Sequence, residues 1–266
     1  MSAPLRIVAT LALDDRDDAV LAAVRALTAR RATDVTLLHV QARAGAGIPD
    51  ALAAAAARLG VPATTRVVAG TVDHAAESVL LEVGADLLVV GRSAAADGAA
   101  AWGPHGRALL RAAGCPVLVV PVGSVTAFGR AALGMDLSPS ALDALVLARG
   151  LFDDVLAIAV LAPEDAAAGA AEVIASLEAR FHAALAARGL PAAPLAGRAG
   201  SSPADVLLAL APEVDVLVVG SRGLSPLATV LLGSTAERLA GRNHGPVLVV
   251  RRRGDTRGLL GALFRP

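Results

Sequence analysis

The chain has 266 residues, enough for one large domain or two of ordinary size, and 55% of them are apolar. Its 24 basic residues, all arginine, balance 24 acidic residues, so it lacks the basic surplus typical of nucleic-acid binders. No apolar run approaches the roughly 20 residues of a membrane span, the N-terminus lacks a secretory-signal pattern, and a single cysteine excludes an internal disulfide. These features predict a cytoplasmic protein without a nucleic-acid partner or a membrane span.

The first half of the chain alternates between strand and helix patterns. The predicted strands are Arg6–Ala12, Val35–Gln41, Thr65–Ala69, Leu87–Val90 and Val117–Val120, and the predicted helices are Asp17–Arg30, Ala51–Leu59, Val72–Val83 and His105–Ala113. Strands that are apolar throughout suit a sheet covered on both faces. The alternation with helices favours parallel pairing through right-handed crossovers.

The second half repeats this rhythm after a short linker at Pro121–Gly129. Its predicted strands are Ala131–Met135, Leu156–Leu161, Leu195–Ala199, Val216–Val219 and Val247–Val250. A long helix is predicted at Ala171–Ala187, where apolar residues recur at four-residue spacing, and Gly189 is expected to end it.

Two sequence repeats indicate that the halves are copies of one unit. "ADLLVVGRS" from Ala85 returns as "VDVLVVGSR" from Val214, and "PVLVV" from Pro116 returns from Pro246. We therefore predict domains at residues 1–123 and 128–252 and a tail at residues 253–266, which either forms a small amphipathic element or frays. Aligning the segment that begins at Leu13 with the one that begins at Met135 places Asp14 opposite Asp136.

A spaced glycine pattern follows the fourth strand of the second copy: Gly220, Gly223, Gly233 and then Ser234. Glycines let backbone amides approach an anion, and a helix start at Ser234 and Thr235 would add free N–H groups and hydroxyls, with Arg222 as a nearby charge. Ser234 and Glu237 also match a capping box, which needs no ligand. The spacing alone leaves both interpretations open.

The segment from Gly220 to Val250, with Asp136 and Ser138 after the first strand of the copy, resembles the nucleotide-binding part of a universal stress protein. The resemblance covers both halves. It implies two tandem α/β domains, each a doubly wound five-stranded parallel sheet of Rossmann-like type, and pairing of the last strands of the two copies into an intrachain pseudo-dimer. Whether two chains also form a homodimer stays open.

The same resemblance implies a bound ATP and assigns roles to individual residues. Gly220, Gly223, Gly233, Ser234 and Thr235 would hold the ribose and phosphates. Asp136 would lie by the nucleoside or a Mg²⁺ ion, and the backbone of Val160 would lie near the adenine.

The first copy lacks most of these donors. Ala94 stands at the second glycine position, and Pro104 stands opposite Ser234, which removes a hydroxyl and a backbone N–H while still allowing a helix to begin. Asp14 remains after the first strand, and Asp17 and Asp18 are interpreted as helix N-terminal charges. We therefore expect one nucleotide per chain, in the second copy.

The favoured function is an ATP-binding regulatory protein of the stress response, with an unidentified protein partner. Slow ATP hydrolysis or phosphotransfer and a nucleotide-free interaction scaffold are the alternatives. The five histidines show no metal-ligand spacing, and no set of nucleophile, base and acid is recognisable, so no catalytic residue is predicted. Cys115 is expected to pack as a small apolar residue.

Overall fold

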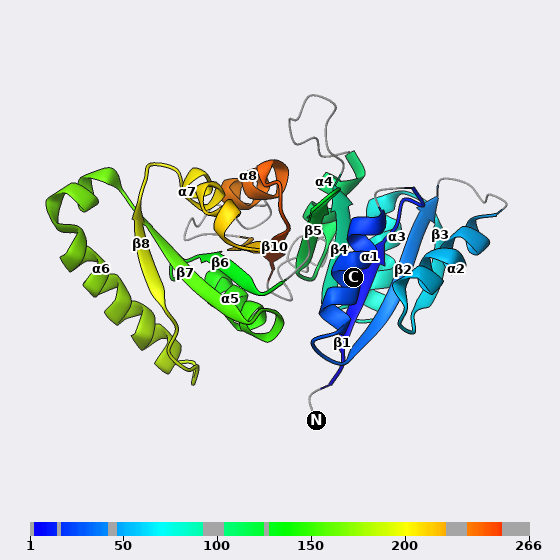
Figure 1. Ribbon diagram of the computed structural model, residues 1–266, viewed down its shortest axis with the longest axis horizontal. Helices are drawn as coiled ribbons and strands as arrows, with labels where there is room; N and C mark the ends of the chain where they lie inside the picture. The colour runs from blue at the N-terminus through cyan, green and yellow to red at the C-terminus, as the bar shows by residue number, and fades with distance from the viewer. Residues whose placement is uncertain are drawn as a thin grey trace, which may run out of the picture. The chain divides into compact units, whose positions relative to one another are not determined.

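The computed structural model describes residues 3–14, 17–41, 47–92, 104–124, 128–221 and 233–251. The chain forms two compact units, the first made mainly of residues before Phe128 and the second mainly of residues from Phe128 to Val250. Figure 1 shows a sheet with flanking helices in each of them. None of the described helices is both long enough and apolar enough to cross a membrane.

The first unit contains a five-stranded sheet in the order β3-β2-β1-β4-β5. Its strands are β1 (Leu5–Thr10), β2 (Thr33–Gln41), β3 (Thr64–Ala69), β4 (Leu87–Arg92) and β5 (Val117–Pro121). Its helices are α1 (Asp17–Thr28), α2 (Ile48–Leu59), α3 (Val72–Glu82) and α4 (Pro104–Ala112). All neighbouring strands of this sheet pair in parallel, as predicted from the apolar strands and the intervening helices.

The second unit has the same strand order in the β10-β9-β6-β7-β8 sheet, and its pairs are also parallel. Its strands are β6 (Arg130–Gly134), β7 (Asp154–Leu161), β8 (Leu195–Ala199), β9 (Val216–Gly220) and β10 (Val247–Val250). Its helices are α5 (Pro139–Leu151), α6 (Pro163–Ala186), α7 (Pro203–Ala209), the 3₁₀ turn η1 (Ala211–Glu213) and α8 (Ser234–Arg242). The predicted α/β fold is therefore confirmed.

The central strands form the core of each unit. Every residue of β5, β9 and β10 is buried, which agrees with a sheet that is covered on both faces. Helices α1 and α2 pack side by side, as do α3 and α4 in the first unit and α7 and α8 in the second.

Helix α6 begins earlier than the sequence predicts. It starts at Pro163 instead of Ala171, and at Gly169 (φ 153°) its backbone leaves helical geometry. The apolar spacing identified only the part after this interruption, in which Phe181 and Leu185 are buried. Gly189, with φ 65°, follows the helix as predicted. Figure 1 shows α6, in yellow-green, beside the edge strand β8.

The strand register corrects the predicted alignment of the two copies. Ile7 of β1 pairs with Leu87, and Ala131 of β6 pairs with Val216, which stands where Leu87 does in the repeat. Ile7 thus corresponds to Ala131, two residues away from the alignment drawn from the sequence. The sequence alignment is easily misplaced by two residues in the turn between strand and helix, because the turn residues show no apolar periodicity that would fix it.

With this register, both copies have a leucine with a left-handed backbone conformation at the same position. Leu13 has φ 63° and Leu137 has φ 60°, each in the turn that follows the first strand of its unit. They also share an arginine on the first helix that donates to a carbonyl at or just beyond the end of the second helix: Arg25 to Leu59 O and Arg149 to Pro191 O. These contacts recur in both units and therefore belong to the fold.

Candidate functional site

The carboxyl ends of β6 and β9 meet where the strand order of the second sheet reverses. From β6 the chain continues to β7 and β8 on one side, whereas β9 and β10 lie on the other. Ligands of open α/β sheets bind at such a reversal, because the adjacent connections lead away in opposite directions. Asp136 follows β6, and Gly220 ends β9. The structure thus brings these two predicted residues to one edge of the sheet.

Asp136 lies in a turn that its own side chain helps to shape. Its Oδ1 accepts a hydrogen bond from Ser138 N at 2.9 Å, and Ser138 Oγ accepts one from Ala141 N at 3.2 Å, which caps α5. Ser138 is buried, whereas Asp136 is exposed. Within the described chain, Oδ2 of Asp136 has no hydrogen-bond partner. A positioned carboxylate oxygen is therefore available to a ligand.

Gly220 is required by helix packing. A Cβ atom at this position would lie 2.8 Å from Ser140 Oγ, 2.9 Å from Ser140 C and 3.0 Å from Ala141 N. Only glycine allows the first turn of α5 to pack this closely against the end of β9. This close approach explains one glycine of the predicted motif without a ligand.

The start of α8 differs from the predicted capping box. Gly233 is the N-cap residue (φ −61°, ψ 144°) and makes no side-chain cap bond, and Ser234 is the first helical residue. The capping-box interpretation is wrong, because the N-cap position is occupied by Gly233, which has no side-chain oxygen, and Ser234 lies one position inside the helix. Ser234 is exposed. The hydroxyl group and the first-turn N–H groups at Ser234 and Thr235 therefore remain available as donors.

Ser221 connects this helix start to the sheet. Its N–H donates to Val250 O and its carbonyl accepts from Gly233 N, both at 2.8 Å. The residue is 2% exposed, and its Oγ has no partner within the part of the chain that the structure describes. Ser221 therefore fixes Gly233 beside the carboxyl end of β9, a role the glycine spacing did not indicate.

Three other predicted site residues have different outcomes. Val160 lies near the carboxyl end of β7, where it pairs with Arg198 of β8. Because β7 is the neighbour of β6, Val160 lies at the same end of the sheet as Asp136. Arg222 and Gly223 lie outside the described residues. Their predicted roles stay predictions.

The first unit has lost the counterpart of Asp136. In the register set by the strands, Ala12 corresponds to Asp136 and Asp14 corresponds to Ser138. The prediction that Asp14 keeps the acidic position is therefore wrong.

Asp17 fills the equivalent turn of the first unit. Its carboxylate is 3% exposed and accepts from Ala12 N at 2.9 Å and from Leu13 N at 2.7 Å. Burial raises the pKa of this carboxyl, and the hydrogen bonds from Ala12 and Leu13 partly oppose that effect. The sequence suggested that Asp17 is a charge that interacts with the helix dipole. The structure shows instead that its buried carboxylate accepts hydrogen bonds from the backbone of the preceding turn. The corresponding residue in the second unit is Ala141, which has no side-chain acceptor.

The end of β4 also differs from the end of β9. Arg92 stands where the second unit has Ser221 and is 4% exposed, and burial lowers the pKa of its guanidinium. Helix α4 begins at Pro104, one residue before the predicted start at His105, so its first residue has no N–H to offer. At these positions, the described residues of the first unit thus offer neither the carboxylate nor the first-turn donor of the second unit.

Within the described ranges, no three His, Cys, Asp or Glu side chains group as metal ligands would. His39 Nδ1 lies 2.9 Å from Leu11 O, and His74 Nδ1 lies 3.0 Å from Thr71 Oγ1 in an exposed turn. Cys115 is buried, as predicted.

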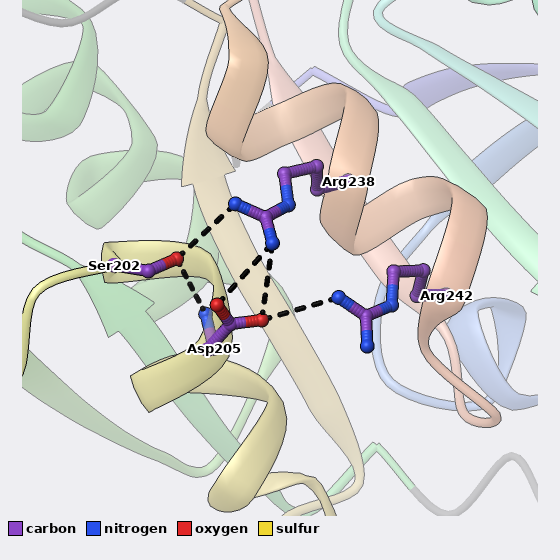
Figure 2. A network of polar contacts seen from close by, with 4 residues as sticks. All are labelled: Ser202, Asp205, Arg238 and Arg242. Atoms are coloured by element: carbon purple, nitrogen blue, oxygen red, sulfur yellow. Dashed lines mark hydrogen bonds and ion pairs between the residues drawn. The ribbon is translucent and has the colours of Figure 1, made fainter.

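A polar network between α7 and α8 was missed by the sequence analysis. Figure 2 shows Asp205 of α7 and Ser202, the N-cap residue of that helix, facing Arg238 and Arg242 of α8. Ser202 Oγ accepts from Asp205 N at 3.3 Å and caps α7. The hydrogen bond from Ser202, followed by the charges of both arginines, lowers the pKa of the Asp205 carboxyl. The Ser-x-x-Asp pattern signals the cap, but no local pattern identifies its arginine partners.

Comparison with known proteins agrees with this architecture. The model of the universal stress protein family matches residues 42–121 and 128–251. A universal stress protein from Archaeoglobus fulgidus is 19% identical and has a TM-score of 0.66, over 94% of this chain and 98% of its own. A functionally unknown protein from Pseudomonas aeruginosa PAO1 is 18% identical, with a TM-score of 0.64, over 98% of this chain and 97% of its own.

One further solved structure resembles a single copy. It is a universal stress protein in complex with cAMP, 28% identical, with a TM-score of 0.35 over 47% of this chain and 97% of its own. The sequence has no match among curated proteins. The first family match begins after β2, so it leaves out α1, which carries Asp17, and the turn before it, which carries Ala12.

Proposed function

Because the chain belongs to the universal stress protein family, we propose that it is an ATP-binding regulatory protein of the stress response that holds one adenine nucleotide in its second copy. One observation supports this most directly. The second copy has exposed donors at the start of α8 and a positioned Asp136 at the same sheet edge, whereas the first copy has Pro104, Ala12 and the internal acceptor Asp17 at the matching places.

The proposed contacts follow from the chemistry of the groups. The N–H groups and hydroxyls of Ser234 and Thr235 would donate to phosphate oxygens at the positive end of the α8 dipole. Gly233 would let the backbone approach closely, with Gly220, Arg222 and Gly223 contributing from the β9 side. The backbone of Val160 would lie near the adenine.

A magnesium ion fits the residues present. Mg²⁺ keeps several waters and binds through one or two carboxylates together with substrate phosphates. Asp136 has one carboxylate oxygen, Oδ2, without a partner among the described residues. It would hold the ion through this oxygen, while the ion offsets phosphate charge when bound.

Replacing Ser234 by proline tests the phosphate contact without disturbing the helix. Proline is favourable at the first helical position, and Pro104 occupies that position in α4 of this same chain. The variant loses one N–H and one hydroxyl, each worth about 1.5–3 kcal/mol when it donates to a charged group, so ATP affinity should fall at least about a hundredfold. Titration calorimetry measures this, and Ser234→Ala, which removes only the hydroxyl, should lose less.

The number of sites gives a second test. Native mass spectrometry should find one adenine nucleotide per chain after gentle purification, and titrations with ATP, ADP and cAMP should rank the ligands. Unchanged ATP affinity in Ser234→Pro, or two nucleotides per chain, would refute the proposed site.

The regulatory role adds a protein partner to this proposal. An ATP-dependent surface can be recognised only if the partner has different affinities for the two nucleotide states. Affinity capture with ATP-saturated wild type and with Ser234→Pro would test this. A partner retained equally by both proteins would contradict nucleotide-dependent regulation.

A further inference from the structure

Helix α8, which carries the proposed phosphate donors, has a small apolar contact with the rest of the unit. Its buried residues are Ala236, Leu239 and Ala240, two of which contribute only a methyl group. Little apolar surface is therefore available to fix the rotation of the helix about its axis or its shift along that axis.

The opposite side of α8 carries two arginines one turn apart that converge on a single carboxylate. Arg238 Nη2 lies 3.3 Å from Asp205 Oδ1 and 3.2 Å from Oδ2, and Arg242 Nη1 lies 3.2 Å from Oδ1. Figure 2 shows both guanidinium groups reaching from α8 towards this residue of α7. Contacts from two successive turns oppose rotation as well as sliding.

Asp205 is itself held in place. Ser202 Oγ accepts from Asp205 N and also from Arg238 Nη1, each at 3.3 Å, so the hydroxyl contacts both partners of the ion pair. A carboxylate fixed at the start of α7 makes a defined anchor for α8. Arg238 is one helical turn beyond Ser234, so the anchor acts close to the donors.

We propose that Asp205 is a positioning residue for nucleotide binding, which sets the orientation of the first turn of α8 through Arg238 and Arg242. This inference rests on the proposed function for its effect on ATP, but the effect on α8 can be measured without nucleotide. Exposed ion pairs contribute little to overall stability. The role of the network is therefore to determine where α8 lies, more than whether the unit folds.

A change in the orientation of α8 alters ATP affinity because it changes the fraction of molecules whose donors are oriented for binding. Apparent affinity falls in proportion to that fraction, because the ligand must first select the competent state. Asp205→Asn should weaken ATP binding about three- to tenfold on this basis. Simple electrostatics predicts the opposite direction, since removing a negative charge and freeing two arginines would tighten the binding of an anion.

The matched control is Asp143→Asn. Asp143 of α5 pairs with Arg188 at 2.7 Å, and these two side chains, 32% and 31% exposed, are partly exposed like those of the network, which are 47–59% exposed. The two variants remove the same charge from the same unit, but only one of them touches α8. Hydrogen exchange of the amides from Glu237 to Leu239 and calorimetric titration with ATP would be measured for both variants. The single variant Arg238→Gln and the double variant that combines it with Asp205→Asn complete a double-mutant cycle.

Faster exchange at these amides and weaker ATP binding in Asp205→Asn alone, with non-additive effects in the double variant, would support the proposal. Unchanged exchange, or ATP binding as tight as in the wild type, would overturn it. If the wild type binds no nucleotide while exchange still increases in Asp205→Asn, the proposed function fails, and so does a positioning role for nucleotide binding, although the anchor on α8 stands. Equal changes in Asp143→Asn would show a general effect of charge and also overturn it.

Discussion

Gly220→Ala tests whether the first glycine of the motif is required for packing. The structure predicts that this glycine is needed for packing between β9 and α5, in the absence of any ligand. The added methyl group would meet three atoms of the α5 start at 2.8–3.0 Å. Two of them are backbone atoms, Ser140 C and Ala141 N, which can move away only if the helix shifts.

The expected cost follows from overpacking. Forcing an additional methyl group into a packed site typically costs about 1–3 kcal/mol. In a unit of this size, each kcal/mol lowers the melting temperature by on the order of 4 °C. Gly220→Ala should therefore melt roughly 4–12 °C below the wild type, with the free energy of unfolding from urea titration reduced to match.

Two further variants separate the causes. Gly134→Ala is the matched control, because its Cβ would meet only Leu207 Cδ1, at 2.9 Å, the mobile end of a side chain that can rotate away. It should cost less than Gly220→Ala. Adding Ser140→Ala to Gly220→Ala removes one of the three close contacts and should restore only part of the loss. Full restoration, or equal costs for the two glycine variants, would refute the packing argument.

The remaining predictions concern the first unit and the aromatic pair. Asp17→Asn should lose about 1–3 kcal/mol of unfolding free energy in urea titrations, because its amide NH₂ would face one of the two buried N–H donors, Ala12 and Leu13; full stability would contradict this. Since the folded pKa of Asp17 is raised above 3.8, its titration contributes stability that is fully present below pH 3.8 and is lost as the pH rises through the folded pKa. The difference in unfolding free energy between the wild type and Asp17→Ala should therefore shrink over that window, and a difference that grows would reverse the assignment. Phe128→Ala removes a fully buried ring that lies 5.8 Å from Phe152 and should cost about 3–5 kcal/mol in the same titrations, whereas a cost below 1 kcal/mol would show that the site collapses.

Most of the fold could be predicted from the sequence, because apolar periodicity acts locally. Strands such as Val247–Val250 are apolar throughout, and their limits agree with the structure. The start of α6 was missed because the alanine-rich segment after Pro163 has no apolar stripe, and Gly169 interrupts the helix. An alanine-rich composition predicts a helix poorly when no apolar residues recur at helical spacing.

The candidate site was less predictable, because its details depend on single-residue register. Ser234 matches a capping pattern but lies one position inside the helix, which reverses the role of its hydroxyl. Asp17 resembles an ordinary N-terminal charge until the strand register brings it against the amides of Ala12 and Leu13. Asp205 and Arg238 are distant in sequence, so only the packing of α7 against α8 reveals their contact.

The paired leucines in the turns after the first strands show which features predate the divergence of the two copies. A left-handed backbone is costly for leucine, by roughly 1–2 kcal/mol relative to glycine, yet Leu13 and Leu137 both adopt it. The first copy has lost the acidic residue and a first-turn donor but retains this strain. The strained turn is thus common to both copies of the folding unit, whereas the groups that could contact a ligand differ between them.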